Sequence, residues 1–175
     1  MNNRLFYGLI VALIIGSVIF IGTTKNKHQL PPRLGTAQAD EANPRKHIAP
    51  GQKVTYSQPI PTSGPHGNEA PWGYSPQQLP NEAIIHNMEH GGVIISYRPD
   101  LDPSTVSKLV ALFTKPYSDP NFTTSKAIVM PRNGQVEPII LSSWNRILKL
   151  NSYDQKTLEN YYLTNVGKSP EPRGV

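Results

Sequence analysis

Two histidines, a methionine and a glutamate lie close together in the segment Ile84–Ser96 (IIHNMEHGGVIIS) of a chain that has 5 histidines in 175 residues. His86 and His90 are four residues apart, so a helix would place them on one face, one turn apart. A strand would instead place His86, Met88 and His90 on one face, because side chains alternate along a strand. Either conformation brings two imidazoles together, as a transition-metal site requires.

The residue types around the two histidines indicate which metal the site would prefer. Imidazole suits zinc, copper and nickel, and the thioether of Met88 would shift the preference toward copper. Glu89 would add an oxygen ligand or orient an imidazole. A further imidazole is expected from His66 in a Pro/Gly-rich loop, whereas His28 and His47 lie in a polar stretch and are weaker candidates. The predicted metal ligands are His66, His86, Met88, Glu89 and His90, with copper as the first choice and zinc as the second.

Residues His86–His90 also match H-x-x-E-H, the inverted zinc-peptidase motif, in which both histidines bind zinc and the glutamate activates water. The chain would then be a small zinc hydrolase with Glu89 as the general base and Glu159 as the acidic third ligand. That motif needs a continuous helix. Ile84-Ile85 favours a strand, and Gly91-Gly92 would end any helix, so we expect metal binding rather than turnover of a substrate.

A third interpretation needs no metal. Histidines at a strand–turn junction can simply hydrogen-bond to backbone carbonyls, and Gly91-Gly92 would let the chain turn tightly with positive φ. The domain would then be a structural or interaction module. Metal content separates this interpretation from the other two.

Regular elements are readable on both sides of the histidine segment. Gly92–Tyr97 and Ala127–Met130 have the β-branched composition of strands. Asp102 and Pro103 open a helix as its N-cap and first residue, and its apolar face is formed by Val106, Leu109, Val110 and Phe113. Val136–Leu141 is expected to be an edge strand, because Pro138 interrupts it.

A terminal helix is expected to begin near Ser152, with Gln155 completing a capping box. Leu158, Tyr161 and Tyr162 form its buried stripe. Strands and helices alternate without long parallel crossover units, so the sequence predicts an α+β fold. We expect a small, mainly antiparallel sheet with two or three helices packed on it.

Three regions are expected along the chain. Residues 1–22 contain the uncharged apolar run Leu5–Ile21, whose length is that of a single transmembrane helix. Residues 23–53 are rich in proline, polar residues and charge, and are expected to be a flexible tether. The α+β domain is expected to occupy residues 54–175. The short flank before the apolar run is typical of export signals, so we expect the domain to lie outside the cytoplasm.

The overall charge narrows the possible partners. The formal net charge is +5, but the basic residues are scattered and form no stripe with aromatic residues, so nucleic-acid binding is not expected. The chain contains no cysteine, which excludes disulfides and thiolate metal sites. The expected partners are the membrane and a membrane protein complex.

Three segments resemble the DUF3105 family: Thr62–His66 (TSGPH), Trp72–Tyr97 and Pro138–Leu148. They follow the family order of SGPH, G-x-Y, H-x-(L/M)-E-H-G and a W-(G/N)-R-like segment. Asn145 departs from the pattern, because a glycine is more usual after the tryptophan. The resemblance implies an N-terminal membrane segment followed by one compact domain, and it places His66, His86, Glu89 and His90 at positions of the family motifs.

The family resemblance supplies a topology and no established activity. Together with the residues, it leads us to expect a membrane-tethered domain that binds copper or zinc. Such a domain would deliver or buffer metal for a membrane complex.

Overall fold

The computed structural model describes residues 32–114 and 126–172. The predicted membrane segment Leu5–Ile21 lies outside these ranges. No helix in the described part of the chain is long and apolar enough to span a bilayer.

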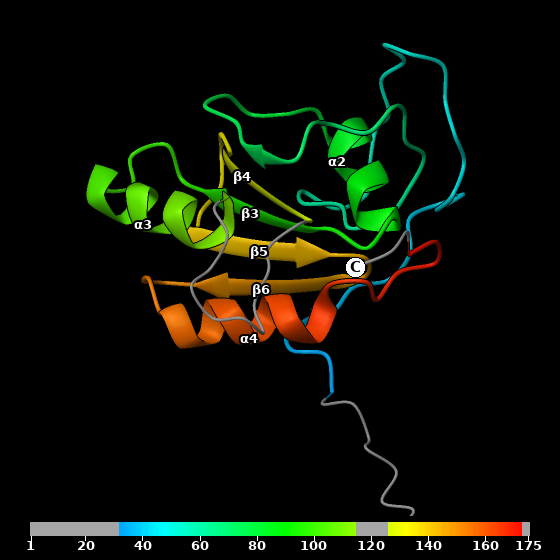
Figure 1. The fold of residues 1–175 in the computed structure, drawn as a ribbon. Coiled ribbons are helices and arrows are strands. Elements are labelled where there is room, and N and C mark those ends of the chain that lie inside the picture. Colours follow the sequence, from blue (N-terminus) through cyan, green and yellow to red (C-terminus); the bar gives the residue numbers. More distant parts are fainter. Residues whose placement is uncertain (1–31, 115–125, 173–175) are drawn as a thin grey trace, which may run out of the picture. The chain divides into compact units, whose positions relative to one another are not determined.

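A six-stranded mixed sheet runs through the domain in the order β1-β6-β5-β3-β4-β2 (Figure 1). Its central strand β3 pairs antiparallel with β5 and parallel with β4, so the sheet is mixed, whereas a mainly antiparallel sheet was expected. The remaining pairings are antiparallel for β1–β6 and β5–β6 and parallel for β2–β4. The strands are β1 (Thr36–Ala37), β2 (Gly73–Tyr74), β3 (Val93–Tyr97), β4 (Ala127–Pro131), β5 (Ile139–Ser143) and β6 (Arg146–Leu150).

Three helices pack on this sheet: α2 (Asn81–Glu89), α3 (Pro103–Thr114) and α4 (Gln155–Asn165). The predicted α+β class and the predicted number of helices are therefore confirmed for the described residues. Helix α3 begins as expected, with the carboxylate of Asp102 accepting a hydrogen bond from the Thr105 N–H at 3.0 Å. Such an N-cap satisfies one of the free N–H groups of the first turn.

Side-chain alternation along the strands divides the core into two clusters. Val93, Ile95 and Tyr97 of β3 face a cluster that includes Leu109 of α3 and Tyr161 of α4. Residue Ile94 of β3 faces the opposite cluster, which contains Ile84, Ile85 and Met88 of α2. Helix α2 therefore covers one face of the sheet, and α3 and α4 cover the other. The separation of α2 from α4 is visible in Figure 1.

Two elements differ from the sequence expectations. Strand β5 lies between β6 and β3 and is not an edge strand, because Pro138 precedes its first residue and so removes no ladder hydrogen bond. Helix α4 begins at Gln155, three residues after Ser152. Its N-cap is Asp154, whose side chain accepts from Thr157 N–H.

Residues 32–53, which the sequence analysis assigned to a tether, are in contact with the domain. Residues Thr36 and Ala37 form β1 on the outer edge of β6. The Arg33 guanidinium donates to Asn165 Oδ1 at 2.9 Å and to the Trp144 carbonyl. The folded unit thus begins at Pro32, ahead of the expected boundary at residue 54.

Strand β6, which the sequence analysis did not predict, forms a tight hairpin with β5. Ser143 pairs with Arg146, so only Trp144 and Asn145 form the turn. Asn145 has φ of 53°, in the left-handed region that glycine and asparagine tolerate best. This backbone conformation explains how an asparagine can replace the more usual glycine here.

Candidate metal site

The His-x-x-Glu-His segment lies on helix α2, and the expectation of a strand at Ile84-Ile85 is wrong. Both isoleucines are fully buried against β3 and β4, so packing of an apolar helix face outweighs their β propensity. Met88 belongs to the same apolar cluster. It is two residues, or about 200°, around the helix from both His86 and His90. The helix therefore brings the two histidines together and turns Met88 into the core.

Gly91 and Gly92, which directly follow the His-x-x-Glu-His motif, end helix α2. Gly91 N–H donates to the Met88 carbonyl at 3.0 Å, and Gly92 N–H donates to the Asn87 carbonyl at 2.8 Å. This pair of bonds, with Gly91 at φ of 88°, is a Schellman motif. The glycines thus fix the last turn of the helix and place His90 at its C-cap position.

We expect Gly91→Ala to destabilise the domain by more than about 1 kcal/mol, because an L-residue is strained at this φ. A Cβ at this position would also lie 2.7 Å from the Gly167 Cα, closer than van der Waals contact allows. Gly134→Ala is the matched control, since it too has positive φ (72°) but open space around its Cβ. Denaturant unfolding of both variants measures the difference. Equal losses would contradict the close packing of Gly91 against Gly167.

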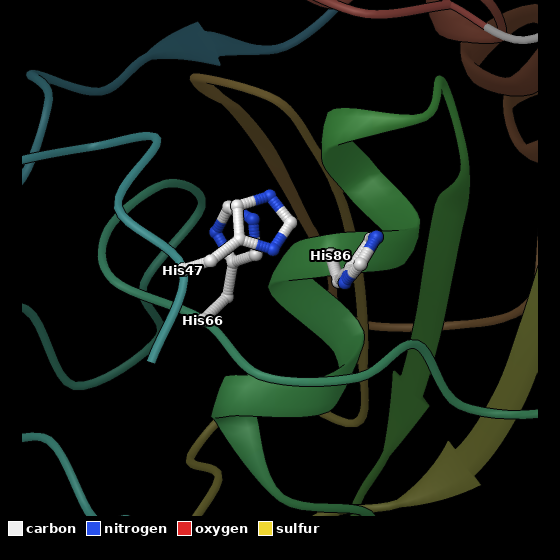
Figure 2. A group of neighbouring side chains, drawn as sticks. All are labelled: His47, His66 and His86. Carbon is white, nitrogen blue, oxygen red and sulfur yellow. The ribbon is translucent and has the colours of Figure 1, made fainter. Parts of the chain in front are cut away.

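His66 and His47 come from two loops that pair next to α2. His66 N–H donates to the Lys46 carbonyl and Ile48 N–H donates to the His66 carbonyl, both at 2.9 Å. The two imidazoles lie with ring centroids 4.6 Å apart, and each is 5.1 Å from the ring of His86. Figure 2 shows this group, with His86 on helix α2 and His47 and His66 on the neighbouring loops.

Three of these histidines use the same nitrogen to fix their orientation. The Nδ1 atoms of His66, His86 and His90 lie within 3.0 Å of the backbone carbonyls of Gly64, Gly67 and Glu171, respectively. A carbonyl can only accept, so each Nδ1 carries the proton. In the neutral rings the lone pair is then on Nε2. Histidines that bind metals are commonly oriented in this way.

The Nε2 atoms of His66, His86 and His90 each face another hydrogen-bond acceptor. Those of His86 and His90 are 2.9 Å apart. When both rings are neutral, neither atom carries a hydrogen, so two lone pairs face each other. A shared proton or a cation near both nitrogens removes this repulsion.

Two hydrogen-bond acceptors also face each other at Glu89, whose side chain is fully buried. Glu89 Oε2 lies 2.9 Å from His66 Nε2, which is also fully buried. This contact lacks the direction of a hydrogen bond, and neither oxygen of Glu89 has a hydrogen-bond donor among the described residues. His47 Nε2 approaches the same oxygen at 3.7 Å. A buried carboxylate without donors is costly unless a cation compensates it.

The observed separations fit the geometry of metal ligands. Bonds of about 2.0–2.1 Å to zinc place neighbouring ligand atoms about 2.9–3.4 Å apart for angles between 90° and 110°. The 2.9 Å separations of His86–His90 and of His66–Glu89 lie at the lower end of that range. Burial lowers the pKa of His86 below 6.5, and the neighbouring histidines lower it further, so its ring is neutral at pH 7.

The structure brings together four of the five predicted ligands: His66, His86, Glu89 and His90. It excludes Met88 from the cluster, and it adds His47, which was expected to be a weaker candidate, and Glu69, which was not predicted. Ligand atoms lie within 4.8 Å of one another in two groups that share His86, namely His47–His66–His86 and Glu69–His86–His90. His28 lies outside the described residues.

The local sequence made His47 only a weak candidate and gave no signal for Glu69. His47 is exposed and lies in a polar, proline-containing stretch, and only its pairing with the His66 loop brings it to the cluster. Glu69 is an exposed residue in a loop with no periodic pattern. In both cases the contact partner is remote in sequence.

A family model described as "Protein of unknown function (DUF3105)" matches residues 47–175. This range contains every residue of the histidine cluster. No curated protein and no solved structure matches the chain.

Proposed function

We propose that the chain, which belongs to the DUF3105 family, binds one transition-metal ion through the Nε2 atoms of His86 and His90 and a carboxylate oxygen of Glu69. The supporting observations are the approach of these ligand atoms to within 4.8 Å of one another and the orientation of both rings, in which a backbone carbonyl holds Nδ1 and the two Nε2 atoms face each other. Glu89 contributes the negative charge that compensates a bound cation. His47, with 60% of its side chain exposed, forms the outer side of the cluster, where an ion arrives from solvent.

We propose zinc as the ion, in preference to copper. The reason for expecting copper was a thioether ligand, and Met88 packs instead with Ile84 and Ile85. Imidazoles with a nearby carboxylate form a ligand set that suits zinc.

Metal handling fits the site better than hydrolysis does. The helical conformation of His86–His90 meets one requirement of the inverted zinc-peptidase motif. However, the acidic third ligand predicted for that motif, Glu159, lies on α4, which packs on the opposite face of the sheet. Glu89 is fully buried and so is not accessible to a substrate. We therefore propose a binding role, such as buffering or delivering the metal.

The choice of metal can be tested with Met88→Leu. We expect this variant to retain the affinity of the native chain for Zn(II) and for Cu(I), because it removes a sulfur that makes no contact with the ion while keeping the apolar volume. Competition titrations against a chromophoric chelator measure both affinities. A selective loss of Cu(I) affinity in Met88→Leu would contradict the zinc assignment and return Met88 to the ligand set.

Zinc affinity should fall when the solution becomes acidic enough to protonate the histidines. Protons and zinc compete for Nε2, and burial lowers the pKa of His86 below 6.5, so this ring resists protonation in mildly acidic solution. We expect the affinity to be constant from about pH 8 to 6.5 and to fall below that range. The same low pKa means that the unfolded chain binds more protons than the folded one, so the metal-free domain should lose stability as pH falls through the same range. Titrations at several pH values test this, and an affinity that already falls above pH 7 would contradict a neutral His86.

Attachment to the membrane through Leu5–Ile21, with the domain outside the cytoplasm, remains part of the proposal. The supporting observation is the uncharged apolar run, whose length is that of a single transmembrane helix. Protease added to intact cells with a permeabilised outer layer should degrade the domain. Complete protection until the inner membrane is broken would contradict this orientation.

A further inference from the structure

A second region with unsatisfied polar groups lies at the other end of α2, around Arg132. The guanidinium of Arg132 belongs to a residue that is only 4% exposed. Its Nη1 donates to Asn81 Oδ1 at 3.0 Å, whereas Nε and Nη2 have no hydrogen-bond partner among the described residues. No ion pair joins Arg132 to a carboxylate within the same ranges of the chain. A buried cation of this kind is costly unless an anion accepts its remaining N–H groups.

The charge on Arg132 persists despite its burial. Removal from water lowers the pKa of Arg132 to about 10, and no neighbouring acid counteracts this shift. Arg132 is therefore still a cation at neutral pH, and two of its N–H donors remain to be satisfied. Arginine presents such donors in a planar fork that matches the oxygens of carboxylates and phosphates.

Arg132 lines a cleft with a volume of about 420 Å³. Polar side chains of Gln78, Asn81 and Asn133 contribute to its wall, and Ile60 and Val136 add apolar surface. A cleft of this size and mixed lining is typical of small-molecule sites. Glu137 also lines the cleft, but its carboxylate is paired with Lys149 at 2.8 Å.

The first turn of α2 adds to the positive potential of this cleft. Asn81 is the first residue of the helix, and the N-cap position is occupied by Pro80, which provides no side-chain acceptor. The positive end of the helix dipole favours an anion there. The first turn also contains Glu82, whose carboxylate accepts a hydrogen bond from the Val54 N–H and lies 3.9 Å from Lys53 Nζ. The helix end and the buried guanidinium are independent features that favour the same kind of ligand.

We infer that this cleft binds a small molecule through an oxyanion group, a phosphate or a carboxylate, which accepts hydrogen bonds from Arg132 next to the first turn of α2. The apolar part of the wall then contacts the body of the ligand. This site shares no residue with the histidine cluster, whose first residue on α2, His86, lies five residues or about 7.5 Å along the helix axis from Asn81. It does not depend on the proposed metal function.

Binding can be tested on the full chain in metal-depleted buffer with three probes: inorganic phosphate, phenyl phosphate and benzoate. Isothermal titration calorimetry and the shift of the unfolding temperature measure the affinity. We expect saturable binding of at least one probe, with phenyl phosphate favoured over inorganic phosphate if the apolar wall contributes. Preference for benzoate would assign the site to carboxylates, and preference for phenyl phosphate would assign it to phosphate esters.

Variants of Arg132 then test whether the probe binds in this cleft. Arg132→Met should lower the affinity for the preferred probe at least tenfold, and Arg132→Lys, which keeps the charge but loses the fork, at least threefold. The matched control is Arg45→Met, which removes an exposed arginine that does not line the cleft and should leave the affinity unchanged. Without a probe, Arg132→Met should unfold at the same temperature as the native chain or at a higher one, because it removes an unpaired buried charge.

If Arg132→Met does not fold, Arg132→Lys alone decides whether the guanidinium is required. Absence of saturable binding by all three probes would overturn the inference, and so would unchanged affinity in the Arg132 variants. Binding retained in His86→Ala would show that the site is independent of the metal cluster. Binding lost in that variant, but retained in Arg132→Lys, would overturn the assignment to this cleft.

Discussion

His86→Ala and His90→Ala are each expected to lower zinc affinity at least 100-fold. Each variant removes one of the proposed ligands, and loss of a residue that merely orients a ligand already costs about 10–100-fold in comparable sites. The 2.9 Å separation of the two Nε2 atoms would let them bind the same ion as neighbouring ligands, so neither would replace the other. Competition titration with a chromophoric chelator gives the affinities.

His47→Ala is the control for these variants. Its imidazole is also part of the histidine group, but it is largely exposed, and its Nε2 lies 3.7 Å from Glu89 Oε2. We expect the zinc affinity to fall about tenfold or less, which is the effect seen for residues that orient a ligand without binding the metal. If His86→Ala or His90→Ala were no worse than His47→Ala, the proposed ligand set would be wrong.

Leu109→Asp is expected to prevent folding. Leu109 is fully buried in the cluster between α3, α4 and the sheet. An unpaired carboxylate there costs several kcal/mol, which is comparable to the entire stability of a domain of this size, about 5–15 kcal/mol. Circular dichroism and denaturant unfolding of the purified variant measure the effect.

Ala111→Asp provides the matched control on the same helix. Ala111 is exposed, so the new carboxylate stays in water, and we expect a change within about 1 kcal/mol. Equal effects of the two substitutions would contradict the orientation of α3 on the sheet.

Much of the fold was predictable because long amphipathic or β-branched segments carry their own signal. The sequence pattern predicted the strand Val93–Tyr97 and the helix that begins at Pro103, including its Asp102 cap. The short pairings β1 and β2 were not predictable, since two residues carry no periodicity and their partners are remote. Helix α2 was mistaken for a strand because its isoleucines are β-branched, and tertiary packing outweighed that preference.

The candidate site was predictable to the extent that its residues lie within one helical turn or in a recognisable family motif. His86, Glu89 and His90 share the last turn of α2, and His66 lies in the SGPH segment. Met88 was misplaced because its assignment depended on a strand geometry that the chain does not adopt. Arg132 gave no sequence signal, since only the fold buries its guanidinium without an acidic partner.

Metal analysis of the purified chain decides whether the histidine cluster holds an ion. After saturation with zinc and removal of unbound ion, we expect elemental mass spectrometry to find about one zinc per chain. Binding to the folded state alone also raises the unfolding temperature, and a chelator should reverse that increase. The His86→Ala/His90→Ala double variant should retain no zinc under the same conditions. A native chain that retains neither zinc nor copper would contradict the account, and its histidines would then be polar residues that only orient the loops around α2.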